Sequence, residues 1–212
     1  MVPIDLYLGF IAATLILCII PGPVVTWLVA TGIRFGPRAS LTGLAGTTCA
    51  LSLHMVLTVL GLAPLLAALG PWTEVLKLIG AAYLVWLGIQ SWRAPYDPHM
   101  DETNGNVVLA IRPSPDTLLR RGFLISVTNP KTLAFYAAFF PQFVSPDAPA
   151  TPQLVILAVT FITVSTISDG TYAVGAGALA PWLKSRRAQT IRNKLSGAVL
   201  ALAGIGLALT RR

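Results

Sequence analysis

Charged residues are scarce in this sequence. Asp, Glu, Lys and Arg make up 11% of the 212 residues, whereas a soluble domain carries about 25% because its surface must stay wetted. Residues 6–33, 39–73, 78–92 and 148–168 contain no such residue at all. A helix needs about 20 apolar residues to cross roughly 30 Å of hydrocarbon. The scarcity therefore excludes a water-soluble globule and predicts an all-α integral membrane protein.

Several chemical motifs are also missing. There is no Gly-x-x-x-x-Gly-Lys-Ser/Thr phosphate loop, Gly-x-Ser-x-Gly elbow or His-Glu-x-x-His pair, which argues against ATP hydrolysis in this chain and against an intramembrane enzyme. Only Cys18 and Cys49 are present, in different apolar runs, so we expect no disulfide framework, no metal site and no cofactor. The first five residues lack Lys and Arg, and we expect the first run to remain as a helix.

The hydrophobic runs indicate six membrane spans. The predicted spans are residues 6–31, 39–68, 71–92, 121–143, 153–183 and 195–210. Residues 93–120 are polar and contain four prolines, which is typical of a solvated loop. We therefore expect a single transmembrane domain over 1–212, with a first three-helix repeat at 1–92, a cytoplasmic loop at 93–120 and a second repeat at 121–212.

The basic residues are distributed unevenly between the two faces of this arrangement. Eleven of them fall on one face: Arg34, Arg38, Arg93, Arg112, Arg120, Arg121, Lys184, Arg186, Arg187, Arg192 and Lys194. The other face receives only Arg211 and Arg212. The positive-inside rule assigns the basic face to the cytoplasm, which predicts a multi-pass protein of the bacterial inner membrane with both termini outside. No basic face with interleaved aromatics is present, so a nucleic-acid partner is not expected.

Three helices per half is an odd number, so a duplicated unit must be inverted across the membrane. The halves correspond weakly, because Gly9-Phe10 precedes Pro21-Gly22-Pro23 in the first and Gly122-Phe123 precedes Asn129-Pro130-Lys131 in the second. Inverted repeats with interrupted helices at matching places are a recurring plan of transporters. The sequence therefore predicts two inverted three-helix repeats.

The two proline motifs carry the strongest local signal. Each proline removes a backbone donor and frees a carbonyl one turn earlier, and such groups cost several kcal/mol in hydrocarbon unless they face protein or a wet cavity. The alternative is a kink that improves helix packing. We expect the motifs to meet near the midplane and to line a substrate site, which gives as site residues Pro21, Gly22, Pro23, Asn129, Pro130 and Lys131.

Three ionisable residues within the predicted spans are candidates for a role in transport. A cation such as Lys131 costs about 2.5–3.5 kcal/mol at the bilayer centre and needs a partner or water. Asp169 is the candidate partner, and it either forms a salt bridge with Lys131 or carries protons, with Lys131 near a substrate carboxylate. His54 is either a proton relay or a hydrogen-bonded packing residue. Asp169 and His54 are therefore the predicted proton-coupling residues.

Together these motifs resemble the lysine exporter and threonine/homoserine/homoserine-lactone exporter (LysE/RhtB) family. The resemblance rests on Pro21-Gly22-Pro23, Lys77-x-x-Gly80-Ala81-Ala82-Tyr83-Leu84-x-x-Leu87-Gly88, Gly122-Phe123, Asn129-Pro130-Lys131, Phe139-Phe140-Pro141-Gln142-Phe143, Ser196-Gly197 and Gly204. It implies efflux of amino acids or related small metabolites, such as homoserine, threonine, homoserine lactone or basic amino acids. The implied driving force is the proton-motive force.

Two other functions remain open at this point. A cadmium-type heavy-metal exporter is one, although only Cys18, Cys49, His54 and His99 could supply soft ligands. A membrane thiol–disulfide carrier is the other, although residues 121–212 contain no cysteine. A stripe of small residues in the last predicted span, Gly197, Ala201, Gly204 and Ala208, indicates helix packing or the face of a homodimer.

Overall fold

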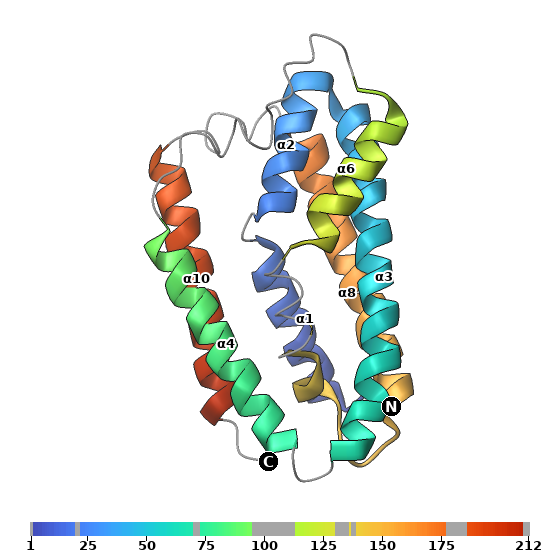
Figure 1. Cartoon of the computed structure of the whole chain (residues 1–212), viewed down its shortest axis with the longest axis vertical. Helices are drawn as coiled ribbons and strands as arrows, with labels where there is room; N and C mark the ends of the chain where they lie inside the picture. The colour runs from blue at the N-terminus through green and yellow to red at the C-terminus, as the bar shows by residue number, and fades with distance from the viewer. Residues whose placement is uncertain are drawn as a thin grey trace.

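The computed structural model describes residues 2–19, 22–69, 73–94, 113–129, 136, 139–176 and 186–209, and these contain helices and turns but no strand. The elements are α1 (Ile4–Ile19), α2 (Pro23–Phe35), α3 (Pro37–Leu69), α4 (Thr73–Arg93), α6 (Pro115–Val127), the 3-10 helix η2 (Phe140–Phe143), α8 (Ala150–Val174) and α10 (Arg186–Leu209). Figure 1 shows the long helices running roughly side by side along one axis.

Two of these helices are long and apolar enough to cross a membrane individually. They cover Pro37–Leu66 and Ala150–Val174, and the bent pair formed by α1 and α2 makes a third if it counts as one broken span. Large apolar side chains lie exposed on the outer surface, including Leu60, Leu124 and Leu202. An all-helical protein with such an apolar surface is suited to lipid rather than to water.

The second and third predicted spans agree with α3 and α4 to within two residues at each end. The first span, predicted at 6–31, consists of α1 and α2, whose axes differ by 51°. Gly36, with φ of 88°, separates α2 from α3. Glycine suits that position because a positive φ is costly for residues with a Cβ.

The prediction was wrong at the start of the second half. α6 begins at Pro115, inside the predicted loop 93–120 and ahead of the predicted span 121–143. Ser114 caps this helix by accepting a hydrogen bond from the Thr117 N–H at 3.3 Å, Pro115 occupies the first turn, and Asp116 complements the helix dipole. These three residues make a strong helix start within a polar sequence.

The last three predicted spans also have different bounds. α6 ends at Val127, and the predicted fourth span closes with η2. α8 begins three residues before the predicted 153–183 span, and residues 177–183 lie outside the described part. α10 begins nine residues before the predicted start at 195. Its basic first turns therefore extend the helix beyond its apolar portion.

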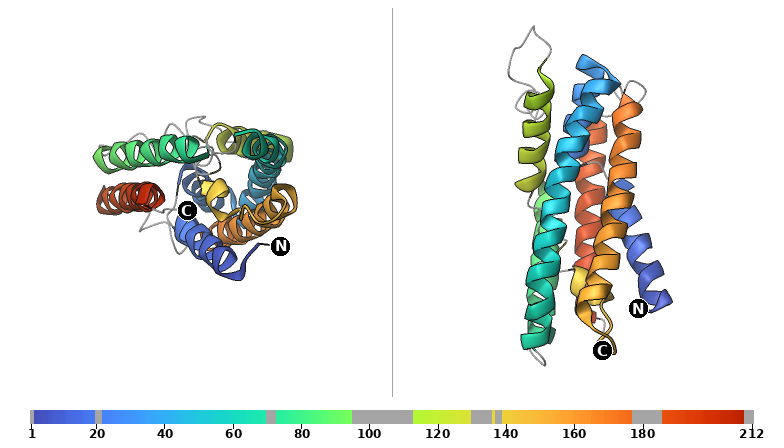
Figure 2. Two further views of the ribbon diagram at one scale, coloured as in Figure 1. Left: turned by 90° about the horizontal axis from the view of Figure 1, so that it is seen from below. Right: turned by 90° about the vertical axis from the view of Figure 1, so that its right-hand side faces the viewer.

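Five of the described α-helices form a bundle, and the other two form a separate pair. Seen end-on in Figure 2, α1, α2, α3, α6 and α8 form a ring around η2 in projection, while α4 and α10 lie together beside this bundle. The starts of α1 and α8 and the ends of α3 and α10 lie at the same end of the molecule (Figure 1). Because α1 begins there, this end is called here the N-terminal end. α4 accordingly runs antiparallel to α10, and α3 runs antiparallel to α8.

Glycines allow the closest helix contacts. A Cβ added to Gly46 or Gly122 would collide with backbone carbonyls of Leu119 or Gly43, so α3 and α6 touch through their backbones. In the outer pair, a Cβ on Gly88 would lie 2.7 Å from the Gly197 carbonyl oxygen. Small residues permit such close approach between membrane helices. The stripe predicted in the last span therefore packs, through Gly197, on α4 of the same chain.

Aromatic side chains are prominent in the largest hydrophobic core among the described residues. Four buried residues, Phe10, Tyr136, Phe140 and Phe161, and the partly buried Phe143 form what is called here the aromatic cluster. The ring centroids of Phe10 and Phe140 are 5.3 Å apart, and those of Tyr136 and Phe161 are also 5.3 Å apart, both in edge-to-face geometry. This arrangement suits the quadrupoles of aromatic rings. It fixes α1, α8 and η2 to one another toward the N-terminal end.

Candidate functional site

A cavity of about 90 Å³ lies where α1, α2, α3, α6 and α8 meet. It is lined by Leu17, Cys18, Gly22, Val24, Val25, Thr47, Thr48, Leu51, Ser126, Asn129, Phe161, Ser165, Thr166 and Asp169. One water needs about 10–15 Å³, so the cavity can hold a small polar solute. It is smaller than the roughly 300–1,000 Å³ typical of pockets for drug-sized ligands.

The break in the first span delivers a helix N-terminus to this cavity. Gly22 is the N-cap of α2 and makes no side-chain capping hydrogen bond, and Pro23 follows it at the first helical position. The first intrahelical bond runs from the Thr26 N–H to the Gly22 carbonyl. The N–H groups of Val24 and Val25 consequently lack helical partners. Together with the helix dipole, they make this wall of the cavity attractive to an anion.

The end of α1 is held by hydroxyl groups of α8. Ser168 Oγ donates to the Cys18 carbonyl oxygen at 3.5 Å, and Ser165 Oγ lies 3.5 Å from Cys18 Sγ. A carbonyl at the end of a helix lacks its usual partner and needs another donor. The hydroxyl groups of Ser165 and Ser168 on α8 therefore pack against the break in the first span.

The end of α6 delivers polar groups from the opposite half of the chain. The Thr128 N–H donates to the Leu124 carbonyl at 3.1 Å, and the Asn129 N–H donates to the Ser126 carbonyl at 3.2 Å. Ser126 and Asn129 are buried and line the cavity. Because the C-terminal end of a helix is the negative end of its dipole, this wall is suited to a cation.

Asp169 supplies a carboxylate to the same cavity. It is partly buried on α8. Its carboxylate charge interacts with the phenols of Tyr136 and Tyr172. One turn earlier, Thr166 Oγ1 approaches Thr48 Oγ1 at 3.3 Å and joins α8 to α3. The cavity thus combines a carboxylate, several hydroxyls and a helix N-terminus.

The predicted site residues are only partly brought together. Gly22, Asn129 and Asp169 all line the cavity, and Pro23 starts α2 beside it without lining it. Pro21, Pro130 and Lys131 lie outside the described residues. The predicted partnership of Lys131 with Asp169 therefore stays a prediction.

His54 does not line the cavity. Its buried ring lies 5.6 Å from the ring of Tyr136, and the backbone of Val127 at the end of α6 lies nearby. Its Nδ1 atom has no hydrogen-bond partner within the described residues. This packing between α3, α6 and the aromatic cluster is the alternative that the sequence left open, while a proton relay through His54 stays a prediction.

Sequence reasoning missed most of the cavity wall. Thr47 and Thr48 are hydroxyl residues within a long uncharged run, which is a usable signal for a polar face. Leu17, Leu51 and Phe161 are apolar residues in apolar helices. Nothing in the sequence distinguishes them from neighbours that face lipid.

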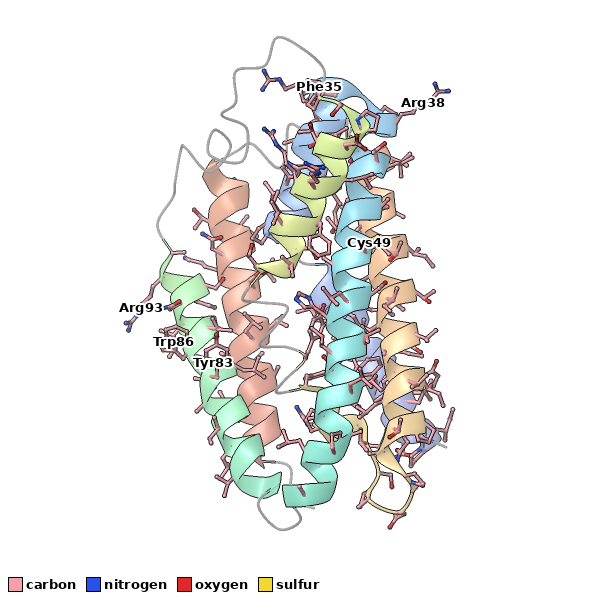
Figure 3. The ribbon with its side chains drawn as sticks, turned by 45° about the vertical axis from the view of Figure 1, so that its right-hand side comes forward. Phe35, Arg38, Cys49, Tyr83, Trp86 and Arg93 are labelled. Carbon is pink, nitrogen blue, oxygen red and sulfur yellow. The ribbon has the colours of Figure 1, made fainter. Side chains whose placement is uncertain are left out.

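The residues that could bind a soft metal are dispersed. Cys49 is exposed on α3 (Figure 3), whereas Cys18 lines the cavity and His54 packs against Tyr136. The described ranges contain no group of three or more His, Cys, Asp or Glu residues able to hold a metal ion. His99, the fourth candidate ligand, lies outside the described residues.

Comparison with known proteins gives a consistent identification. A family described as LysE type translocator matches residues 15–211. The chain is 35% identical to the homoserine/homoserine lactone efflux protein of Salmonella typhimurium, over 97% of both chains. It is 33% identical to an uncharacterized membrane protein of Vibrio cholerae, over 98% of both chains, and 27% identical to the leucine efflux protein of Klebsiella pneumoniae, over 95% of this chain and 92% of that one.

No solved structure matches the chain significantly. The family match nevertheless covers nearly the whole length of the sequence, and the two relatives above that are named for a function are efflux proteins. This confirms the resemblance inferred from the sequence motifs and identifies the protein as a membrane translocator rather than an enzyme. The heavy-metal and thiol-carrier alternatives are therefore not favoured. The chain belongs to the LysE family.

Proposed function

We propose that this protein exports small amino acids such as homoserine from the cytoplasm in exchange for protons. The observation that carries the proposal is the cavity that both the N-terminal residues of α2 and Asp169 line. A free amino acid presents a carboxylate and an ammonium group, and each needs a partner once its water is removed. The efflux relative at 35% identity, named for homoserine, supports the same substrate class.

The proposed binding mode uses both ends of the substrate. The carboxylate accepts hydrogen bonds from the free N–H groups of Val24 and Val25, with Lys131 as a further cation from the second proline motif. A helix N-terminus stabilises an anion by about 0.3–1 kcal/mol when exposed, and by up to about 2 kcal/mol when partly buried. The ammonium binds Asp169 and carbonyls near Asn129.

Proton coupling follows from competition for one carboxylate. When ionised, Asp169 binds the substrate ammonium; when protonated, it loses that charge and no longer attracts a cation. A proton that enters from outside thus displaces the substrate, and its release to the cytoplasm prepares the site for the next one. Intramembrane acids that face a cavity commonly act in this way.

We further propose that the chain crosses the membrane six times as two inverted repeats. The antiparallel directions of α3 with α8 and of α4 with α10 support inversion (Figure 1), because a two-fold axis in the membrane plane would exchange these helices. Among the described residues, Arg34 and Arg38 lie at the end opposite the N-terminal end, and Figure 3 labels Arg38 there. The positive-inside rule then assigns that end to the cytoplasm.

Purified protein in liposomes tests the proposed function. Vesicles loaded with labelled homoserine should release it through the wild-type protein, and faster when protons can flow in the opposite direction. Asp169→Asn should lower gradient-driven release by about 10- to 100-fold. This is the effect expected because a hydrogen bond to a charged group contributes about 1.5–3 kcal/mol, and the substitution removes one. Asp116→Asn, which alters a carboxylate at the start of α6, is the matched control and should transport normally.

The outcomes separate the parts of this proposal. Release no faster than from protein-free vesicles would reject homoserine transport. Wild-type rates in Asp169→Asn, measured per inserted molecule, would remove Asp169 from the coupling mechanism but leave transport intact.

A further inference from the structure

The cavity is polar toward one end and apolar toward the other. α1, α3 and α8 each contribute several lining residues, and on each helix the one nearest the N-terminal end of the molecule is apolar. These three residues are Leu17 on α1, Leu51 on α3 and Phe161 on α8, and they are called here the floor. The lining residues that follow in the direction of the opposite end are Cys18, Thr48 and Ser165 on the same helices.

The floor rests on closely packed side chains. Phe161 is 2% exposed and Leu51 is 7% exposed, and both belong to one buried core with Met55. The Phe161 ring meets Tyr136 edge-on at 5.3 Å and Phe140 at 5.9 Å. Packed interiors of this kind resist deformation. A ligand that presses on the floor must therefore displace the aromatic cluster.

We propose that the floor receives the side chain of the transported amino acid and limits it to a short, uncharged group. This inference rests on the proposed function, because binding the carboxylate and ammonium at the polar end leaves the side chain pointing to the floor. Along α8, Phe161 and Asp169 are eight residues apart, which is about 12 Å at 1.5 Å per residue. The ammonium, the α-carbon and the whole side chain must fit within that span.

This geometry separates the candidate substrates. A hydroxyethyl group is unbranched, and its hydroxyl can reach Ser165, one turn from Phe161. The isobutyl group of leucine is equally long but carries a second methyl group in place of the hydroxyl, and that wider group would press on the Phe161 ring. A lysine or glutamate side chain would bring a charge against apolar groups, which is costly without a partner. The floor therefore excludes the basic amino acids that the family resemblance allowed.

The test is a change of selectivity in variants with a lowered floor. Homoserine and leucine release are measured in the same liposomes for wild type, Phe161→Ala and Leu51→Ala. When an apolar pocket gains or loses room for one methylene group, its preference between two substrates that differ by that group changes by about 10- to 200-fold. We expect the ratio of leucine to homoserine transport to rise about tenfold or more in each variant. Val159→Ala, at a position on α8 that is 58% exposed, is the matched control and should keep the wild-type ratio.

A variant that narrows the cavity provides the converse measurement. Leu51→Phe adds volume at the floor and should reduce homoserine release at least tenfold more than alanine release. This variant retains the packed aromatic cluster, so it decides the question even if Phe161→Ala fails to insert.

The floor inference and the proposed function fail in different ways. If wild type releases homoserine and all three floor variants keep the wild-type selectivity per inserted molecule, the floor inference is overturned and the function stands. If wild type releases no homoserine, the proposed function fails first.

Discussion

Replacing Gly46 by alanine should disturb the backbone contact that positions one wall of the cavity. The added Cβ would lie 2.9 Å from the carbonyl carbon and 3.0 Å from the Cα of Leu119 on α6. Carbon atoms in contact prefer about 3.5–4.0 Å, and the carbonyl oxygen of Leu119 lies nearer still, so α6 must retreat by about 1 Å or more. The obstacle is backbone, which cannot rotate away as the tip of a side chain could.

The expected cost follows from known core substitutions. Overpacking a well-packed interior costs about 1–3 kcal/mol, and for a chain of this length each kcal/mol lowers the melting temperature by about 2–4 °C. Gly46→Ala should therefore melt about 2–10 °C below wild type in detergent. Transport per folded molecule should fall as well, because α6 holds Ser126 and Asn129 at the cavity.

Gly61→Ala is the control on the same helix. No atom lies within 4 Å of the position that its Cβ would occupy, and alanine favours a helix over glycine by about 0.8–1.0 kcal/mol. This variant should melt at or slightly above the wild-type temperature. Equal melting temperatures for Gly46→Ala and Gly61→Ala would refute the proposed backbone contact as a determinant of stability.

Two further measurements address topology and the position of the cavity. Reporter fusions after Arg38 and Arg187 should report the cytoplasm and fusions at Ala148 the exterior, and an exchange of sides would contradict the six-span orientation. In a Cys49→Ser background, homoserine should slow the reaction of Cys18 with a small thiol reagent severalfold, because Cys18 lines the cavity; unaltered labelling at saturating homoserine would place the substrate elsewhere.

The bounds of a helix could be predicted where helix-breaking residues mark its ends clearly in the sequence. Gly36-Pro37 separates α2 from α3, and the run that follows from residue 39 contains no Asp, Glu, Lys or Arg, so the bounds of α3 were nearly right. α6 was missed at its start because Arg120 and Arg121 occupy its second turn. These charged residues were interpreted as part of a solvated loop, although a helix can begin in water before it enters lipid. The same reasoning placed the start of α10 too late.

The cavity could be predicted only where residues contrast with their surroundings. A proline break and a lone acid are conspicuous in an apolar run, so Gly22, Asn129 and Asp169 were identified as candidates before their proximity was known. Phe161 and Leu51 offer no contrast, because lipid-facing and cavity-facing apolar residues look alike in the sequence. Only the packing of α3, α6 and α8 distinguishes them.

The pairing of α4 with α10 has a consequence for how the protein is made. α4 ends at Arg93 and its partner ends at Leu209, so the ribosome completes α10 roughly 100 residues after α4. At about 5–20 residues per second, synthesis of the intervening chain takes on the order of 5–20 seconds. During that interval the surface around Gly88 has only lipid to contact. A nascent chain that stops before residue 186 therefore leaves α4 without its glycine-packed neighbour, an unassembled helix that quality-control proteases of the membrane can recognise.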